Sequence, residues 1–205
     1  MWNWLRLAFG ALTLVAIGLQ LNIHIRSGFS GVNFFSYFTN LSNFIASVVL
    51  ILGARPAVMS REAGEPGDQV RAVSAVNMAV VGIVFSILLR DVDLGSLLPW
   101  VNVVLHYVMP CFVVLDWLVR PPKATLRVRH LVRCLIFPAL YLAYVIIRGA
   151  ETGWYPYPFF NPENVGGYGG VALYASGISV TFLVVAGILM RAGNWMSRRS
   201  LPNAP

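Results

Sequence analysis

Six long apolar segments constrain this chain more than any other feature of its sequence. An α-helix rises about 1.5 Å per residue, so about 20 apolar residues cross the roughly 30 Å hydrocarbon core of a bilayer. Six segments approach this length, and they cover residues 5–23, 34–53, 72–90, 97–118, 130–148 and 169–191. We therefore predict an all-α integral membrane bundle of six transmembrane helices, in which residues 1–205 form a single transmembrane domain.

The composition supports the same fold class. The chain is 58% apolar and 11% charged, with a mean hydropathy of +0.70. Soluble domains average roughly 45–50% apolar and about 25% charged residues, so these values exclude an ordinary soluble enzyme and a disordered chain. Cys111 and Cys134 both lie in apolar segments, which argues against a disulfide framework or a cysteine zinc site. The sequence also has no glycine-rich phosphate loop and no metal-ligand cluster, so we expect no cofactor and no metal.

Basic residues are divided unevenly between the two sets of helix ends. Of the 15 Lys and Arg residues, 12 lie at one set of ends and 3 at the other. Because cytoplasmic ends carry the excess of Lys and Arg, we predict that both termini are cytoplasmic. The basic stretch 120–133 is interpreted as a topology determinant that contacts anionic lipid headgroups. It has no accompanying pattern of stacking aromatics, so we expect membrane lipids, and no nucleic acid, as partners.

Two connections are long, and they differ in composition. Residues 54–71 carry mixed charges with prolines and glycines, which is typical of a flexible linker. Residues 149–168 are rich in aromatics and prolines and include Tyr157, so we expect a folded cap on the membrane surface.

Polar residues form a stripe along the second apolar segment. At about 100° per residue, Ser36, Thr39, Asn40 and Asn43 fall within an arc of about 100°. Because lipid offers no hydrogen-bond partner, such residues face the bundle interior, and a cluster of them suggests a functional site. A structural role is the alternative: hydroxyl groups can bond carbonyls of their own helix, and asparagines can join helices.

The fourth apolar segment brings a histidine to a similar depth. Asn102 and His106 share a helix face at spacing i, i+4. His106 lies about 14 Å from the predicted outer end of its segment, and Thr39 about 8 Å from that of its own. In the fifth segment, Tyr144 and Arg148 lie on one face near the same outer end. The predicted cytoplasmic half has no comparable group. The alternative for His106 is a purely structural role, in which it only forms hydrogen bonds that hold the helices together.

A hydroxyl and an imidazole on neighbouring helices fit nucleophilic catalysis. A threonine hydroxyl needs a positioned base, and His is the side chain suited to that role near neutral pH. We therefore predict Thr39 as nucleophile and His106 as base. Substrate-binding groups or oxyanion donors are expected among Asn40, Asn43, Asn102, Tyr144, Arg148 and Tyr157. A site open to the outer leaflet favours an amphiphilic ester. The spacing does not choose between this hydrolase and a non-catalytic cavity that binds lipid or a small solute.

Several short motifs resemble a known membrane protein family. They are Phe38-Thr39, Trp100-x-Asn102-x-x-x-His106 followed by Pro110 and Asp116, and Tyr157-Pro158-Phe159 before the last apolar segment. Together they resemble the androgen-induced and androgen-dependent six-helix membrane proteins, and more closely their bacterial integral-membrane relatives.

This resemblance implies a threonine hydrolase of fatty acid esters of hydroxy fatty acids, with Thr39 and His106 as the catalytic pair. It also implies a multi-pass protein of the bacterial inner membrane. Two differences from the animal members leave the substrate open. Val103 stands where those members have a second His, and one residue fewer separates His106 from Pro110.

Overall fold

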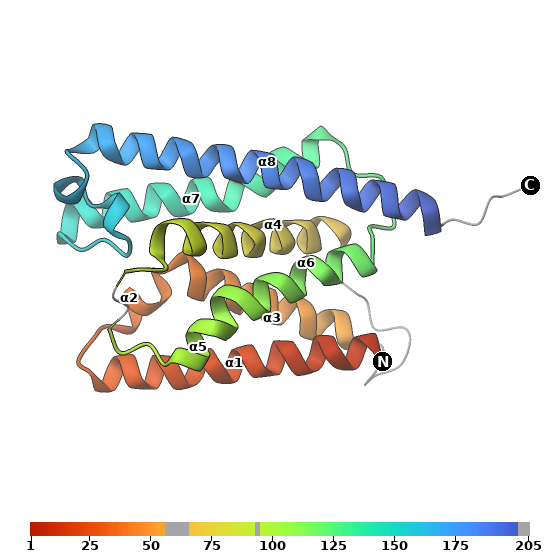
Figure 1. Cartoon of the computed structure of the whole chain (residues 1–205), viewed down its shortest axis with the longest axis horizontal. Coiled ribbons are helices and arrows are strands. Elements are labelled where there is room, and N and C mark those ends of the chain that lie inside the picture. Colours follow the sequence, from red (N-terminus) through yellow and green to blue (C-terminus); the bar gives the residue numbers. More distant parts are fainter. Residues whose placement is uncertain (56–65, 93–94, 201–205) are drawn as a thin grey trace, which may run out of the picture.

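The computed structural model describes residues 1–55, 66–92 and 95–200, and within these ranges the chain is helical without a strand. The long helices run side by side along one axis (Figure 1). Helix α1 begins at the same end of the bundle at which α8 ends, and α2 lies at the opposite end. Residues 56–65 of the expected linker lie outside the described residues.

The helices alternate with short irregular turns. The α-helices are α1 (Trp2–Arg26), α2 (Gly31–Phe35), α3 (Phe38–Ala54), α4 (Asp68–Val84), α5 (Pro99–Val103), α6 (Met109–Val119), α7 (Val128–Thr152) and α8 (Tyr168–Ser200). Two π-helical segments, η2 (Phe85–Leu89) and η3 (Val104–Val108), continue α4 and join α5 to α6. Two 3₁₀ turns, η4 (Pro158–Phe160) and η5 (Pro162–Asn164), lie between α7 and α8.

Five helical stretches among the described residues are long and apolar enough to cross a membrane. They are Trp2–Arg26, Asp68–Leu89, Pro99–Val119, Val128–Thr152 and Tyr168–Arg199. Helix α3 is also apolar but has only 17 residues. The expected second span, 34–53, is broken: α2 ends at Phe35, and α3 begins at Phe38 after an extended residue, Tyr37. The side chain of Asn40 donates a 2.8 Å hydrogen bond to the carbonyl of Phe34, which the end of α2 leaves without a helical partner.

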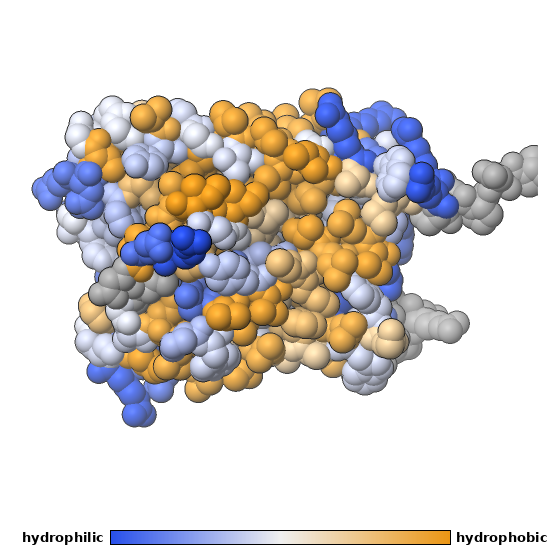
Figure 2. Space-filling view, viewed as in Figure 1, coloured by the Kyte–Doolittle hydropathy of each residue, from blue (hydrophilic) through white to orange (hydrophobic). Residues whose placement is uncertain are grey.

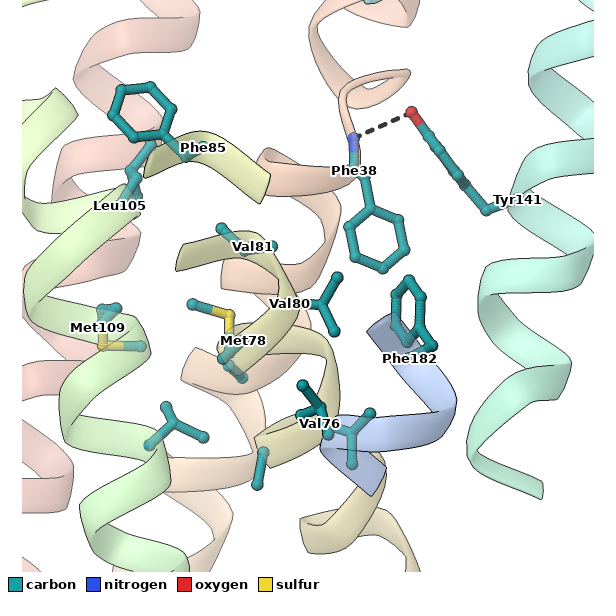
Figure 3. Close-up of a cluster of buried hydrophobic side chains, with 14 of the residues drawn as sticks. Phe38, Val76, Met78, Val80, Val81, Phe85, Leu105, Met109, Tyr141 and Phe182 are labelled. Atoms are coloured by element: carbon teal, nitrogen blue, oxygen red, sulfur yellow. Dashed lines mark hydrogen bonds between the residues drawn. The ribbon is translucent and has the colours of Figure 1, made fainter. Parts of the chain in front are cut away.

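Helix α4 lies at the centre of the bundle and contacts α3, α6, α7 and α8. Its buried side chains, among them Val76 and Met78, and Phe85 of η2 pack against α6, η3 and α8 (Figure 3). Helices α7 and α8 lie at one side and expose large apolar residues such as Leu140 and Leu173. Apolar residues gather over the middle of the face in Figure 2, with the most hydrophilic ones mostly near its two ends. This distribution fits a bundle surrounded by lipid.

Candidate active site

A cavity of about 460 Å³ opens near the end of the bundle that holds α2 and the 153–167 loop. Thr39 from α3 and His106 from η3 both line it, together with Asn40 and Tyr157. The two residues predicted as the catalytic pair therefore border the same space, although 66 residues separate them in the chain.

Thr39 lies in the first turn of α3, where backbone N–H groups have no partner within the helix. The N–H of Phe38 donates to the hydroxyl of Tyr141 at 3.2 Å (Figure 3), and the N–H of Thr39 donates to the hydroxyl of Tyr157 at 3.3 Å. The N–H of Asn40 has no hydrogen-bond partner among the described residues. The Thr39 hydroxyl lies 3.5 Å from that of Tyr157. One hydroxyl thus approaches both the backbone and the side chain of the proposed nucleophile.

One face of α7 holds the corner between α2 and α3. Tyr141 donates to the carbonyl of Ser36 at 2.8 Å, and the hydroxyl of Tyr144 lies 2.7 Å from that of Ser36. One turn further, Arg148 donates to the side chain of Asn33 at 2.6 Å. Tyr144 and Arg148 do not line the cavity. The structure therefore gives them contacts that position the start of α3.

His106 is 6% exposed and is held by two contacts. Its Nδ1 lies 3.1 Å from the carbonyl oxygen of Asn102, and its ring stacks on Phe85 with centroids 3.7 Å apart. A carbonyl can only accept, so Nδ1 carries the proton and Nε2 of the neutral ring is left as an acceptor. Nε2 has no hydrogen-bond partner among the described residues, and no hydrogen bond joins His106 to Thr39 directly. This is the protonation pattern that a general base requires.

Pro110 accounts for the local geometry around His106. In η3 the N–H of Met109 donates to the carbonyl of Val104, five residues back. Pro110 has no N–H, so the carbonyl of Leu105 lacks the next such bond. The side-chain amide of Asn43 donates to that carbonyl at 3.0 Å and to the carbonyl of Thr39 at 2.9 Å. One side chain therefore joins the helix of Thr39 to the segment of His106.

The three predicted asparagines occupy different positions. Asn40 lines the cavity, but its amide is bonded to the carbonyl of Phe34. Asn43 and Asn102 are not among the residues that line the cavity. Asn43 bridges two carbonyls, and the buried Oδ1 of Asn102 has no hydrogen-bond partner in the described part of the chain. Two residues that line the cavity with Thr39 carry candidate donors: Asn40, whose backbone N–H has no partner among the described residues, and Tyr157, with its hydroxyl.

Tyr157 belongs to the loop that closes the cavity. Burial raises the pKa of its hydroxyl above the ordinary value of a tyrosine. The group therefore stays protonated at neutral pH, and its proton remains available to an acceptor beside Thr39. Tyr157, Phe159 and Phe160 are all buried, so the expected cap at residues 149–168 is a packed element.

Other cavity-lining residues were not predicted as site residues. They are mainly polar or aromatic, and include Gln20, His24, Asn33, Trp154, Asn161 and Asn164. Trp154, Asn161 and Asn164 belong to the 149–168 loop, whose composition indicates a folded cap. Gln20 and His24 belong to the first helix, and nothing in their sequence spacing connects them to the site. The part of the chain with described coordinates has no group of three or more His, Cys, Asp or Glu side chains able to hold a metal ion.

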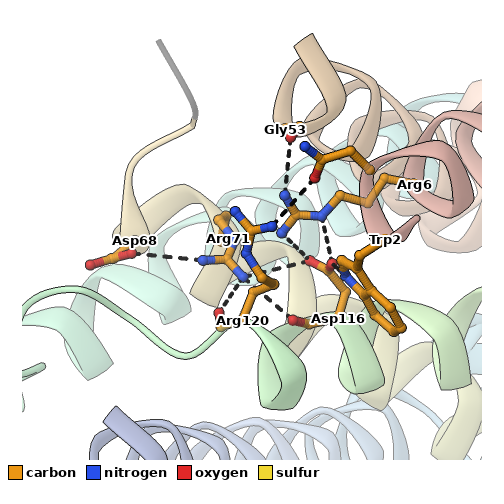
Figure 4. Close-up of polar contacts among 8 residues, drawn as sticks. Trp2, Arg6, Gly53, Asp68, Arg71, Asp116 and Arg120 are labelled. Carbon is orange, nitrogen blue, oxygen red and sulfur yellow. Dashed lines mark hydrogen bonds and ion pairs between the residues drawn. The ribbon is translucent and has the colours of Figure 1, made fainter. Parts of the chain in front are cut away.

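A buried ionic cluster lies at the other end of the bundle, where the sequence indicated no polar group (Figure 4). Arg6 donates to both carboxylate oxygens of Asp116, at 2.6 and 3.0 Å, and Arg71 lies 3.6 Å from the same carboxylate. Trp2 also donates to Asp116 at 2.7 Å, and Arg6 donates to the carbonyl of Gly53 at 3.0 Å. These contacts join α1, α3, α4 and α6. The cluster therefore has a structural role and lies far from the cavity.

The comparisons with known proteins identify the family. A family model described as FAR-17a/AIG1-like protein matches residues 31–192, which is more than half of the chain. The chain belongs to the FAR-17a/AIG1-like family. This is the androgen-induced family that the motifs at Thr39, His106 and Tyr157 resemble. The FAR-17a/AIG1-like match includes both proposed catalytic residues and the loop that closes the cavity. No curated protein and no solved structure matches the chain significantly.

Proposed function

We propose that this protein is an intramembrane hydrolase of fatty acyl esters, with Thr39 as nucleophile and His106 as base. The observation that carries the proposal is that these two side chains, from α3 and η3, line one cavity. The unprotonated Nε2 of His106 supports it, because a threonine hydroxyl is a weak nucleophile until a base takes its proton.

The reaction would proceed in two steps. His106 Nε2 takes the Thr39 proton as Oγ1 attacks the ester carbonyl carbon, and the oxyanion accepts hydrogen bonds from the Asn40 N–H and the Tyr157 hydroxyl. Collapse of this intermediate breaks the bond to the alcohol oxygen, which receives the proton from His106 and leaves an acyl-threonine. Water then attacks the acyl carbon and gives a proton to His106. The bond between the acyl carbon and Oγ1 breaks as His106 returns this proton to Oγ1, which releases the carboxylic acid and restores the Thr39 hydroxyl.

The proposed setting is a multi-pass cell membrane, with the bacterial inner membrane as the specific case. We place the cavity at the outer leaflet and both termini in the cytoplasm, because 12 of the 15 basic residues lie at the ends that would face inward. The proposal counts α3 as a sixth span, between the five longer helices. Membrane lipids surround the bundle, and the substrate is an amphiphilic ester.

A non-catalytic protein that binds lipid or a small solute is the second candidate. The contacts of the pair favour it: the Thr39 hydroxyl lies 3.5 Å from that of Tyr157, while His106 bonds its own helix and stacks on Phe85. In this role the cavity would bind an amphiphile or solute without breaking a bond, and the protein would support transport or assembly.

Hydrolysis of a nitrophenyl palmitate by the purified protein in detergent distinguishes the two candidates. We expect Thr39→Ala and His106→Ala each to lower kcat by about 10²–10⁴-fold while the protein stays folded. Ser47→Ala is the matched control, because Ser47 is buried on α3, bonds the carbonyl of Asn43 and does not line the cavity. Activity that is unchanged in Thr39→Ala would exclude the hydrolase mechanism.

A further inference from the structure

A second cavity, of about 320 Å³, lies beside Thr39 and is lined mainly from α4, α7 and α8. The cavity of about 460 Å³ at the candidate active site is called the polar cavity here. Both cavities are lined by Thr39, Tyr157, Phe85 and Leu89, so the two spaces adjoin at the proposed nucleophile. The lining of the second cavity is mainly aliphatic and aromatic, and none of its lining residues in the described part of the chain is charged. Its remaining lining residues include Leu135, Leu142, Ala175, Ile178, Phe160 and Phe182.

Residues of α7 and α8 that line this apolar cavity also lie at the surface of the bundle. Ala139 on α7 and Ser179 and Leu183 on α8 line the cavity, and all three are exposed. The same side of the bundle exposes Leu140 and Leu173, which are 67% and 74% accessible. In a membrane this surface faces lipid tails. One cavity is therefore lined both by Thr39 and by residues that would face the hydrocarbon region.

We infer that the apolar cavity holds one linear acyl chain of the substrate, which reaches Thr39 sideways between α7 and α8. The inference rests on the proposed function, because it assigns the two parts of an ester to two spaces that adjoin at the nucleophile. A carbonyl at Thr39 would place its acyl chain among Leu142, Ile178 and Phe182. The alcohol part would lie in the polar cavity, since a polar group in the apolar one would have few partners.

Shape sets the chain-length preference of such a cavity. Lipid tails are as apolar as the lining, so moving a chain from the bilayer into the cavity gains little hydrophobic free energy. Selection must then come from the space that the lining leaves free. Small side chains at Ala139 and Ala175 provide part of that space, one from each flanking helix.

The first test compares nitrophenyl palmitate with nitrophenyl butyrate. We expect Ala175→Phe and Ala139→Phe each to lower the palmitate-to-butyrate ratio of kcat/KM by about tenfold or more, because the added ring occupies the space of the chain. Ala172→Phe on α8 and Ala143→Phe on α7 are the matched controls. Both of those alanines are exposed, do not line the cavity, and should leave the ratio unchanged. Thermal unfolding shows which variants are folded, and the two helices provide independent variants.

The second test measures binding without turnover. Thr39→Ala protein is irradiated with palmitic acid that carries a diazirine near its methyl end, and the labelled residues are mapped by mass spectrometry. We expect label at Leu142, Ile178 or Phe182, and its loss when Ala175→Phe is added.

The combined outcomes separate this inference from the proposed function. Thr39-dependent hydrolysis with an unchanged chain-length ratio, and label confined to exposed positions such as Leu140, would overturn the acyl-chain site alone. The opposite outcome is labelling of cavity residues that Ala175→Phe abolishes, in a protein that shows no esterase activity. It would support the acyl-chain site and refute the hydrolase.

Discussion

At the scale of single residues, Tyr157 makes the contacts that most affect the proposed chemistry. Its hydroxyl lies 3.3 Å from the backbone nitrogen of Thr39 and 3.5 Å from the Thr39 hydroxyl, and its ring stacks on Phe159 with centroids 5.1 Å apart. Phenylalanine would keep the stacked ring and remove only the hydroxyl. The role of the hydroxyl can therefore be tested separately from the packing of the loop.

We predict that Tyr157→Phe lowers esterase kcat by about 10²-fold, as expected for loss of one donor to an oxyanion. The free energy of unfolding should fall by only about 1 kcal/mol, since one hydrogen bond to the Thr39 backbone is lost. Steady-state kinetics and thermal unfolding measure the two effects. A normal kcat would mean that this hydroxyl only positions α3.

The pH dependence of the wild type follows from the same residue. Burial raises the pKa of the Tyr157 hydroxyl, so in the folded protein it stays protonated beyond the pH at which an exposed tyrosine ionises. Its contribution to stability is therefore complete below pH about 10 and is lost as the pH rises through the raised pKa. Unfolding measured between pH 8 and 11 should show a smaller decline in Tyr157→Phe than in the wild type.

Residue types and the family resemblance together pointed to Thr39 and His106, and the structure places both side chains on one cavity. Their catalytic roles stay a prediction. Their surroundings were less predictable. Tyr157 was selected from an aromatic-rich loop, but its contact with Thr39 joins residues 118 positions apart. The stacking of His106 on Phe85 likewise joins two spans, and no periodicity within either span reports it.

At the scale of helical elements, the expected continuous helix at 97–118 differs from the structure at one turn. Residues Val104–Val108 are π-helical, directly before Pro110. A proline inside an apolar segment signals a break in the hydrogen-bond pattern, and the sequence therefore contains the cause. It does not show that Asn43, from another helix, satisfies the carbonyl that Pro110 leaves free.

We predict that Asn43→Leu destabilises the protein and lowers its activity together. The carbonyl of Leu105 would lose the donor that replaces the missing N–H of Pro110, which costs about 1–3 kcal/mol when the group stays unsatisfied. The carbonyl of Thr39 would lose one of its donors but keeps its place as a backbone acceptor within α3. The α3 and η3 segments would then no longer be held in register. Thermal unfolding and esterase kinetics are measured on the same preparation. A large loss of activity at unchanged stability would instead indicate a direct oxyanion donor.

At the scale of the whole molecule, the two ends of the bundle are built differently. One end holds the polar cavity. At the other end, the buried cluster of Arg6, Arg71 and Asp116 joins the helices to one another. Apolar length and charge distribution were enough to predict a helical membrane protein, and five helices among the described residues have the required length. The cluster was missed because Arg6 and Arg71 were interpreted only as topology signals, and their shared partner lies in a third span.

The cluster gives an asymmetric prediction about stability. Asp116 faces two arginines, and Arg71 has a second carboxylate partner, Asp68, at 3.8 Å. Asp116→Leu therefore leaves the buried charge of Arg6 without a carboxylate and should cost about 3–5 kcal/mol. Arg6→Met keeps the contact between Arg71 and Asp116 and should cost less. Denaturant or thermal unfolding of the two variants shows which one loses more stability. Equal losses would show that Arg71 does not compensate for Arg6.

The measurement that tests the central claim most directly is the site at which a long-chain alkyl fluorophosphonate attaches. Attack by the Thr39 oxygen on phosphorus would release fluoride and leave a covalent adduct on the peptide that contains Thr39. We predict that mass spectrometry finds this adduct in the wild type, that Thr39→Ala abolishes it, and that His106→Ala slows its formation about 10²-fold or more. An active wild-type protein with no adduct on Thr39, or an adduct on another residue that persists in Thr39→Ala, would contradict the account.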